Sequence, residues 1–172
     1  LGLMRWGLIP PWAKDASIGS KMINARAETV AEKPSFKRLL IKRRCVIIAD
    51  GFYEWRTEEK KKTPMLIRLK SNEPFGFAGL YDTWTSPAGE NITSCTIITT
   101  HANELMKPIH DRMPVILSKE AQRVWLDPAV QEPGELVALL KSYPAEEMQA
   151  YSVSTLVNSP RNNSRECIEP SK

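Results

Sequence analysis

The fold expected for this chain rests on two neighbouring runs, Cys45-Val46-Ile47-Ile48-Ala49 and Gly51-Phe52-Tyr53-Glu54-Trp55. Both are short and rich in β-branched or aromatic residues, which is typical of strands. The second run places one carboxylate, Glu54, among three aromatic residues. Burial disfavours a charged carboxylate and raises its pKa toward the range in which a general acid or base works. Glu54 is therefore a candidate catalytic residue, and the alternative is a solvated strand residue that faces outward.

Further short elements surround these runs and predict the fold class. Strand candidates are Leu3 to Trp12, Met65 to Leu69, Phe75 to Leu80, Cys95 to Thr99, Pro114 to Leu117 and Tyr151 to Val157. Helix candidates begin at Pro34, run from Glu120 to Leu126, and carry Leu136, Leu139, Leu140 and Tyr143. Closely spaced strands predict an antiparallel sheet. We expect a β-rich α+β fold, in which a curled antiparallel sheet forms a pseudo-barrel with short peripheral helices.

The length of 172 residues suits one domain, which we place at residues 1–158, followed by a loop-like tail at 159–172. Residue 1 is leucine, and the first residues have the apolar character of a core. We therefore expect the domain to lack an N-terminal segment in this chain.

Composition excludes several classes of protein. The apolar runs are too short for a membrane span and no signal peptide is visible, so we expect a cytoplasmic protein, associated with the nucleoid in a bacterium. Three cysteines without a C-x-x-C pair and only two histidines argue against a disulfide framework and a metal site. We expect no cofactor, no metal and a monomer.

Positive charge predominates, with a net charge of +4 and a pI of about 9.0. It is concentrated in Lys37-Arg38, Lys42-Arg43-Arg44 and Lys60-Lys61-Lys62. A basic face suits a polyanion such as nucleic acid, because neutralised phosphates release counterions. The alternative is a solvated surface, and we favour it for the triple lysine.

Two further groups of residues suit chemistry on a sugar or a phosphate. In Asn24-Ala25-Arg26, the amide and the guanidinium are two residues apart and face the same way in an extended segment. This pair suits a phosphodiester or an oxyanion. The alternative is a loop asparagine beside a surface ion pair between Arg26 and Glu28.

In Pro108-Ile109-His110-Asp111-Arg112-Met113-Pro114, prolines close to both ends suggest a rigid loop. His110 can act as an acid or base near neutral pH and Arg112 can bind an anion, although a lone histidine is more often structural. We assign His101 a structural role. Trp6, Trp12, Trp55 and Trp84 either stack on unpaired bases or pack in the core.

Four motifs in order resemble the SRAP family, the SOS response-associated peptidase or abasic-site processing proteins. They are Arg5-Trp6-Gly7-Leu8-Ile9-Pro10 with Trp12, Asn24-Ala25-Arg26-Ala27-Glu28-Thr29, Gly51-Phe52-Tyr53-Glu54-Trp55 and His110-Asp111-Arg112-Met113-Pro114. The resemblance implies a DNA-damage response protein that binds single-stranded DNA. It also implies covalent capture of abasic sites through an N-terminal cysteine, whose amine and thiol form a thiazolidine with the sugar aldehyde.

The resemblance also implies roles for individual residues. Glu54 would be the acid/base for sugar opening and imine chemistry, and Asn24 would orient the amine or sugar. His110 would protonate the opening sugar, or assist strand scission and reversal of the link. Arg26 and Arg112 would hold phosphates, and Arg5 and Trp6 would complete the DNA-binding set.

This chain departs from the family pattern at its start, where the Met-Cys-Gly-Arg sequence is absent. The cysteines Cys45, Cys95 and Cys167 are internal and lack the free amine, so we expect this chain to bind DNA without forming the thiazolidine. Two alternatives stay open: a non-covalent single-stranded DNA-binding module, and a cysteine peptidase that uses an internal cysteine with His110.

Overall fold

The computed structural model describes residues 1–59 and 61–171, so Lys60 of the lysine run and Lys172 lie outside the described residues. The chain divides into two compact units. The first contains Leu1–Ile47, Gly76–Thr100 and Pro114–Lys141. The second contains Ile48–Phe75, His101–Met113 and the chain from Ser142 onward. The expected acid/base residues Glu54 and His110 belong to the second unit, whereas Asn24 belongs to the first.

The sheet of the first unit has the strand order β1-β7-β6-β3. These strands are β1 (Arg5–Trp6), β7 (Asn91–His101), β6 (Phe75–Thr85) and β3 (Arg44–Ala49). Three more short strands join it: β2 (Asn24–Arg26) and β8 (Arg112–Pro114) pair with β7, and β9 (Ile116–Leu117) pairs with β6. β6 and β7 are antiparallel, whereas β1 and β2 both run parallel to β7.

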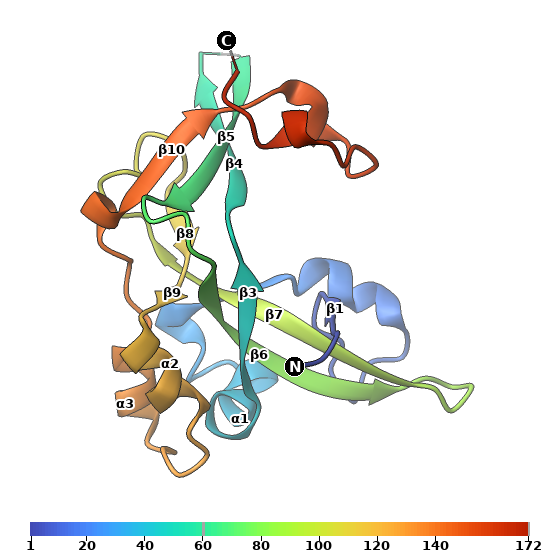
Figure 1. Cartoon of the computed structure of the whole chain (residues 1–172). Coiled ribbons are helices and arrows are strands. Elements are labelled where there is room, and N and C mark those ends of the chain that lie inside the picture. Colours follow the sequence, from blue (N-terminus) through green and yellow to red (C-terminus); the bar gives the residue numbers. More distant parts are fainter. Residues whose placement is uncertain (60, 172) are drawn as a thin grey trace. The chain divides into compact units, whose positions relative to one another are not determined.

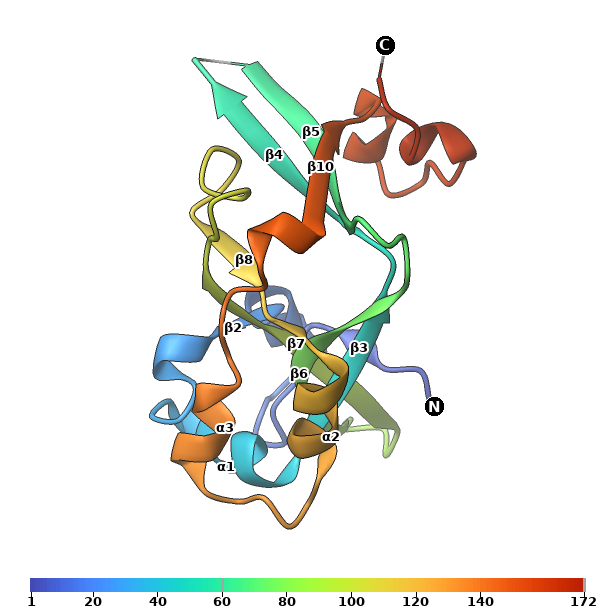
Figure 2. The same cartoon turned by 60° about the vertical axis from the view of Figure 1, so that its left-hand side comes forward.

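Three helices accompany this sheet: α1 (Pro34–Lys42), α2 (Lys119–Leu126) and α3 (Pro133–Ala138), which lie together in Figure 2. Pro34 starts α1 as predicted, because a proline at the first helical position loses no helical hydrogen bond. The predicted apolar stripe of α1 is buried in the core. This core contains Leu8, Ala25, Phe36, Leu39, Leu40, Ala78, Leu80, Ile98, Trp125 and Leu136. Two 3-10 helices, η1 (Ala16–Lys21) and η2 (Ala27–Thr29), complete the unit.

The second unit is built on an antiparallel sheet of order β10-β5-β4, made of β4 (Phe52–Glu58), β5 (Lys61–Leu69) and β10 (Met148–Ser152) (Figure 1). Its remaining elements are short: η3 (Ala145–Glu147), η4 (Thr155–Asn158) and η5 (Arg165–Cys167). β8 (Arg112–Pro114) follows the His110 loop. The C-terminal segment lies beside the sheet, and an isolated bridge joins Val153 to Pro170.

The β-rich α+β class is confirmed, and several details differ from expectation. Among the described residues the strands form two open sheets rather than a closed barrel, and β1 and β2 add parallel pairs to the antiparallel ones. Leu1 and Leu3, expected in the core, are fully exposed because β1 begins only at Arg5. No helix among the described residues is both long and apolar enough to cross a membrane.

Candidate functional site

Strand β4 sets the direction in which Glu54 points. Successive side chains of a strand face opposite sides of the sheet. The residues on either side of Glu54 contact the C-terminal segment: the Tyr53 hydroxyl donates to the Cys167 carbonyl (3.0 Å), and Trp55 Nε1 donates to Asn158 Oδ1 (2.8 Å). Glu54 therefore faces the other side of the sheet, away from that segment.

The environment of Glu54 explains its electrostatics. Its cross-strand partner on β5 is the buried Met65, and of the three neighbouring aromatics only Phe52, two residues away, shares its face. Burial is the largest influence and raises the pKa of Glu54, as predicted. The charge of His110 and a hydrogen bond from the Trp55 backbone lower this pKa, and Asp111 raises it. Glu54 is thus held as a carboxyl group that is protonated more readily than a solvated one.

The loop that carries His110 is held by side chains the sequence analysis did not single out. Asn103 Nδ2 donates to the Tyr143 carbonyl (2.7 Å), and Asn103 Oδ1 accepts from the Met106 backbone N–H (3.0 Å). Met106 is fully buried, and its carbonyl accepts from the His110 N–H (2.9 Å). The loop therefore owes its position to Asn103 and Met106 as well as to its prolines.

The neighbours of His110 Nδ1 suit two forms of the ring. Nδ1 lies 3.1 Å from the Arg112 backbone N, 3.2 Å from the Arg112 carbonyl oxygen and 3.1 Å from Asp111 Oδ1. When Nδ1 accepts the Arg112 N–H, the ring carries its proton on Nε2. In the charged ring, Nδ1–H faces the Asp111 carboxylate and the Arg112 carbonyl, and Nε2 is protonated too. In both of these forms Nε2–H is available as a proton donor.

A second group of predicted residues gathers along β7 in the first unit. Trp6 pairs with Cys95, Asn24 with Ile97 and Arg26 with Thr99. These three β7 positions alternate, so the three side chains share one face of the sheet. All three are exposed, whereas Ala25 between Asn24 and Arg26 is buried in the core.

Trp6 and β2 are also linked directly. The Trp6 indole N–H donates to the Ile23 carbonyl (2.9 Å), immediately before Asn24. Arg5, in contrast, pairs with Ser94, so it faces the opposite side of the sheet from Trp6. The predicted site residues thus form one group in each unit: Glu54, His110 and Arg112 in the second, and Trp6, Asn24 and Arg26 in the first.

The basic run Lys42-Arg43-Arg44 is only partly available to a ligand, because Arg44 is a structural residue. Its Nε donates to the Trp125 carbonyl (2.5 Å), and its Nη1 donates to the carbonyls of Leu40 (2.9 Å) and Ile41 (2.6 Å). Its Nη2 donates to the carbonyls of Asp127 (2.6 Å) and Val130 (3.0 Å). These bonds match the five N–H donors of a guanidinium.

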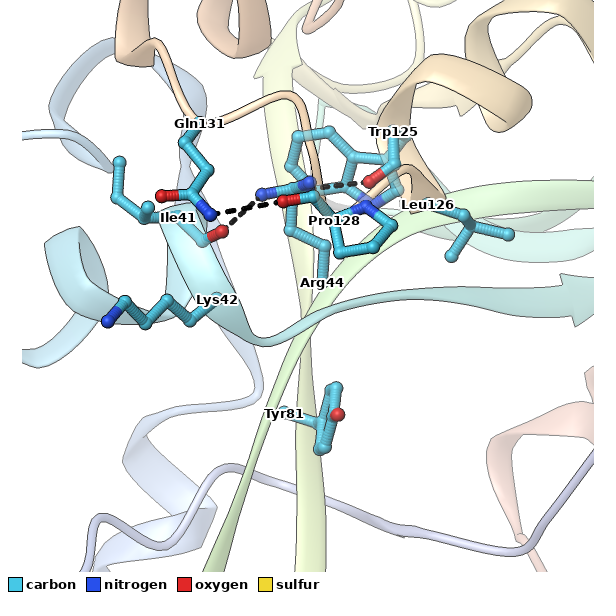
Figure 3. A pocket seen from close by; sticks show the side chains of 8 residues that line it. All are labelled: Ile41, Lys42, Arg44, Tyr81, Trp125, Leu126, Pro128 and Gln131. Atoms are coloured by element: carbon cyan, nitrogen blue, oxygen red, sulfur yellow. Dashed lines mark hydrogen bonds between the residues drawn. The ribbon is translucent and has the colours of Figure 1, made fainter.

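Arg44 lines a cavity of about 280 Å³ with Ile41, Lys42, Tyr81, Trp125, Leu126, Pro128 and Gln131 (Figure 3). Its guanidinium points to the carbonyls at the ends of α1 and α2, and also lies over the Trp125 ring. Arg44 therefore joins these helices, and the nearby exposed charges are those of Lys42 and Arg43.

Replacing Arg44 should test this structural role. Arg44→Ala removes one donor from each of five carbonyls, of which the Asp127 carbonyl keeps the Val130 N–H, and we expect it to lower the free energy of unfolding by about 3 kcal/mol. Lys42→Ala, an exposed neighbour, should change it by less than about 0.5 kcal/mol. Urea denaturation followed by tryptophan fluorescence measures both. Equal stabilities for the two variants would contradict the assignment.

The three cysteines are free and buried. Burial raises the pKa of Cys45 to about 12, with a smaller contribution from the Cys95 thiol, and burial also raises the pKa of Cys95. A thiol with such a pKa is a poor nucleophile at neutral pH. The described residues also contain no group of three or more His, Cys, Asp or Glu side chains suited to a metal ion.

Known proteins similar to this chain cover most of its length. The family model described as SOS response associated peptidase (SRAP) matches residues 1–160. The abasic site processing protein YoqW of Bacillus subtilis is 60% identical over 170 residues, which cover 98% of this chain and 76% of that protein. The abasic site processing protein HMCES of Xenopus tropicalis is 38% identical, over 98% of this chain and 56% of that protein. A crystal structure of a Bacteroides thetaiotaomicron protein superposes with a TM-score of 0.91 at 35% identity, over 98% of this chain and 76% of that one.

Proposed function

We propose that this chain, which belongs to the SOS response associated peptidase (SRAP) family, supplies the DNA-binding and acid/base residues for the capture of abasic sites in single-stranded DNA as covalent crosslinks. Relatives named abasic site processing proteins support DNA-damage processing as the general role. The substrate form, the crosslink and the residue roles below are our proposal. The observation that carries it is half-buried Glu54, whose pKa is raised by burial and lowered in part by the charge of His110, a residue whose Nε2–H can donate a proton.

This pair suits the opening of a sugar ring. An abasic sugar is a cyclic hemiacetal, and it opens when its ring oxygen gains a proton while its hydroxyl loses one. In our proposal Nε2–H of His110 protonates the ring oxygen, and the Glu54 carboxylate accepts the hydroxyl proton. The protonated Glu54 that results then donates to the hydroxyl that leaves as water when an amine condenses with the aldehyde.

The nucleophile in this scheme is a cysteine with a free α-amine, as the family resemblance implies. The amine forms the imine with loss of water, and the thiolate adds to the imine carbon, while the nitrogen gains a proton, to close the thiazolidine. Cys45, Cys95 and Cys167 do not serve this role, because each is internal and buried. Asn24 would orient the amine or the sugar.

The remaining predicted residues would hold the strand. Arg26 and Arg112 offer guanidinium groups to phosphates, and Trp6 offers an exposed indole on the same sheet face as Arg26. Arg5 would add a further phosphate contact from the opposite face of that sheet.

Arg112→Ala should weaken binding to single-stranded DNA of any sequence. It should also lower the slope of log affinity against log salt concentration by about 0.7, the contribution of one phosphate contact on a single strand. Fluorescence anisotropy at four salt concentrations measures this slope. Glu54→Gln serves as the comparison and should leave the slope unchanged, so an equal loss in both variants would contradict the separate roles.

The covalent step is tested by incubating the complete gene product with single-stranded DNA that carries one abasic site. A polypeptide of residues 1–172 is run beside it, on denaturing and native gels. A band that survives denaturation only for the gene product would support capture through a terminal cysteine. Retardation of DNA by both proteins in the native gel alone would support a non-covalent DNA-binding module instead.

The non-covalent module is the second candidate, and the basic face of α1 favours it independently of any nucleophile. A cysteine peptidase with an internal nucleophile is disfavoured, because burial raises the pKa of Cys45 and Cys95.

A further inference from the structure

A second cavity, of about 470 Å³, opens on the first unit beside the start of α1. Its lining residues are Pro10, Pro11, Trp12, Pro34, Ser35, Arg38, Leu39 and Asp82. Asp82 pairs with Ser94, which also pairs with Arg5, so these three residues lie in one row. Because Trp6 belongs to the next row, Asp82 and the cavity lie on the sheet face opposite Trp6, Asn24 and Arg26.

Trp12 presents a preorganised aromatic surface to this cavity. The residue is 66% exposed. The turn around it is fixed on both sides: the Ala13 N–H donates to the Pro10 carbonyl (2.9 Å), and the Trp84 indole N–H donates to the Ala13 carbonyl (2.7 Å). A large indole left exposed on a rigid turn offers stacking area at a small ordering cost.

Arg38 places a positive charge in the same cavity. Asp82 is buried, and its Oδ2 accepts from Arg38 Nη2 at 2.5 Å, while its Oδ1 accepts from the Thr83 N–H at 3.0 Å. The Arg38 side chain is still 55% exposed. The buried carboxylate therefore holds one edge of the guanidinium and orients it, and the rest of this group is accessible.

All charged residues of the helix that carries Arg38 are basic. Its sequence, Pro-Ser-Phe-Lys-Arg-Leu-Leu-Ile-Lys, contains no acidic residue, and Lys33 precedes it. Lys33, Lys37 and Lys42 are exposed. A basic surface beside an exposed aromatic is the combination by which proteins bind unpaired strands, since phosphates follow the charge and bases stack on the ring.

We propose that this cavity is a second subsite for single-stranded DNA, in which one unpaired base stacks on Trp12 and a neighbouring phosphate pairs with Arg38. The inference rests on the proposed function and extends it. A strand bound along Trp6 and Arg26 would continue to the opposite face of the sheet, where Arg5 also points. The occupant is a nucleotide of the bound strand at a distance from the abasic site, without a requirement for a particular base.

Oligonucleotide length separates this subsite from the principal one. We expect Trp12→Ala, in the complete gene product, to weaken binding to an oligonucleotide of roughly 20 nucleotides about tenfold, because it removes one stacked base. Binding to one of roughly 5 nucleotides centred on the abasic site should not change, since such a strand fills one site only. Trp12→Phe keeps an aromatic ring and should retain most of the affinity for the long strand.

A second variant tests the phosphate contact. Arg38→Gln should lower the salt slope for the long strand by about 0.7 and leave the slope for the short strand unchanged. Lys141→Ala is the control. Lys141 is an exposed lysine at the end of the segment Pro114–Lys141 of the first unit, and its replacement should leave binding to both strands as in the wild type.

Each result decides between the two proposals. Equal affinity of wild type and Trp12→Ala for the long strand would overturn the subsite and leave the proposed function intact. Loss of affinity for both lengths in Trp12→Ala would also overturn it, because the residue would then act on the principal site or on folding. Failure of the wild type to bind either strand would overturn the proposed function, and the subsite with it.

Discussion

Glu54→Gln, introduced into the complete gene product, should slow covalent capture of an abasic site by about 10²–10⁴-fold, the usual contribution of a positioned general acid or base. Glutamine keeps the shape of the side chain but neither accepts nor releases a proton at neutral pH. DNA affinity should remain close to that of the wild type, because no phosphate contact is lost. The rate is measured under single-turnover conditions by quenching samples into a denaturing gel.

The rate of capture should depend on pH through the protonation of Glu54. Burial raises the pKa of Glu54, so its protonated form persists to higher pH than that of a solvated glutamate. Capture begins with Glu54 as a carboxylate that accepts the hydroxyl proton, so the rate should fall as pH drops through this raised pKa, at a higher pH than for a solvated glutamate. The Glu54→Gln profile should lack this limb.

The raised pKa of Glu54 should also make the stability of the fold depend on pH. A carboxyl group whose pKa is higher in the folded state stabilises the fold below its unfolded pKa, and this stabilisation is lost as pH rises through the folded pKa. Glu54→Gln should therefore have a higher melting temperature than the wild type at pH 7, and no such advantage at pH 4.

A matched control lies on the same strand. Glu58 is exposed and forms an ion pair with Arg56 at 3.2 Å. Glu58→Gln should capture abasic sites at the wild-type rate. A similar loss of rate in both variants, or a loss of DNA affinity in Glu54→Gln alone, would contradict an acid/base role for Glu54.

Gly7→Ala should lower the free energy of unfolding by about 3–4 kcal/mol, a large part of the stability of a typical domain. Gly7 has φ +108°, which L side chains rarely adopt. A Cβ at this position would lie 2.6 Å from the Gly19 carbonyl oxygen and 3.0 Å from its carbonyl carbon. Backbone atoms cannot rotate away as a side chain can, so the two segments must separate.

Separation would also disturb the anchoring of β1. The Gly7 N–H donates to the Cys95 carbonyl (2.9 Å), and the Leu8 N–H donates to the Met22 carbonyl (3.1 Å). The predicted DNA-binding residue Trp6 directly precedes this contact. Gly7→Ala should therefore impair DNA binding through the position of Trp6 as well as through stability.

Two other glycines serve as controls that distinguish the effect of backbone strain from the effect of the contact with Gly19 on the free energy of unfolding. Gly89 has φ +85° with no atom within 4 Å of the added Cβ, so Gly89→Ala should cost only the backbone strain, about 1 kcal/mol. Gly2 has neither constraint, and Gly2→Ala should be neutral. Urea denaturation of the three variants measures the differences. If Gly7→Ala were no less stable than Gly89→Ala, the contact with Gly19 would not be restrictive.

Local sequence was sufficient to predict the elements whose signals are short-range. Pro34 and the spacing of Phe36, Leu39 and Leu40 predicted α1 and its buried face, and both are confirmed. The apolar run around Glu54 predicted a strand and a raised pKa for that residue, also confirmed. The four ordered motifs were sufficient for the family. The signals for the helix and the strand lie within one turn of helix or a few residues of strand, so these two elements could be predicted without the rest of the chain.

Where local signals conflicted with distant packing, the predictions were wrong. The expected last strand, Tyr151 to Val157, ends at Ser152 and continues into η4. The expected helix carrying Leu139, Leu140 and Tyr143 ends at Ala138. The helical spacing of the apolar residues predicted a longer helix. Leu140 is buried, as this spacing suggests, but it lies outside the helix.

Only the tertiary structure decided which residues share a face or a partner. Arg44 looked like one charge in a basic run, yet it bonds the Trp125 carbonyl 81 residues away. Two of the three aromatics around Glu54 turned to the opposite side of the sheet, and Trp12 joined Arg38 and Asp82 at one cavity. Such groupings depend on strand register and on long loops that bring distant segments together. The local sequence does not specify either. The sequence therefore predicts the chemistry of each side chain. Its neighbours in the fold are determined by the pairing between distant strands.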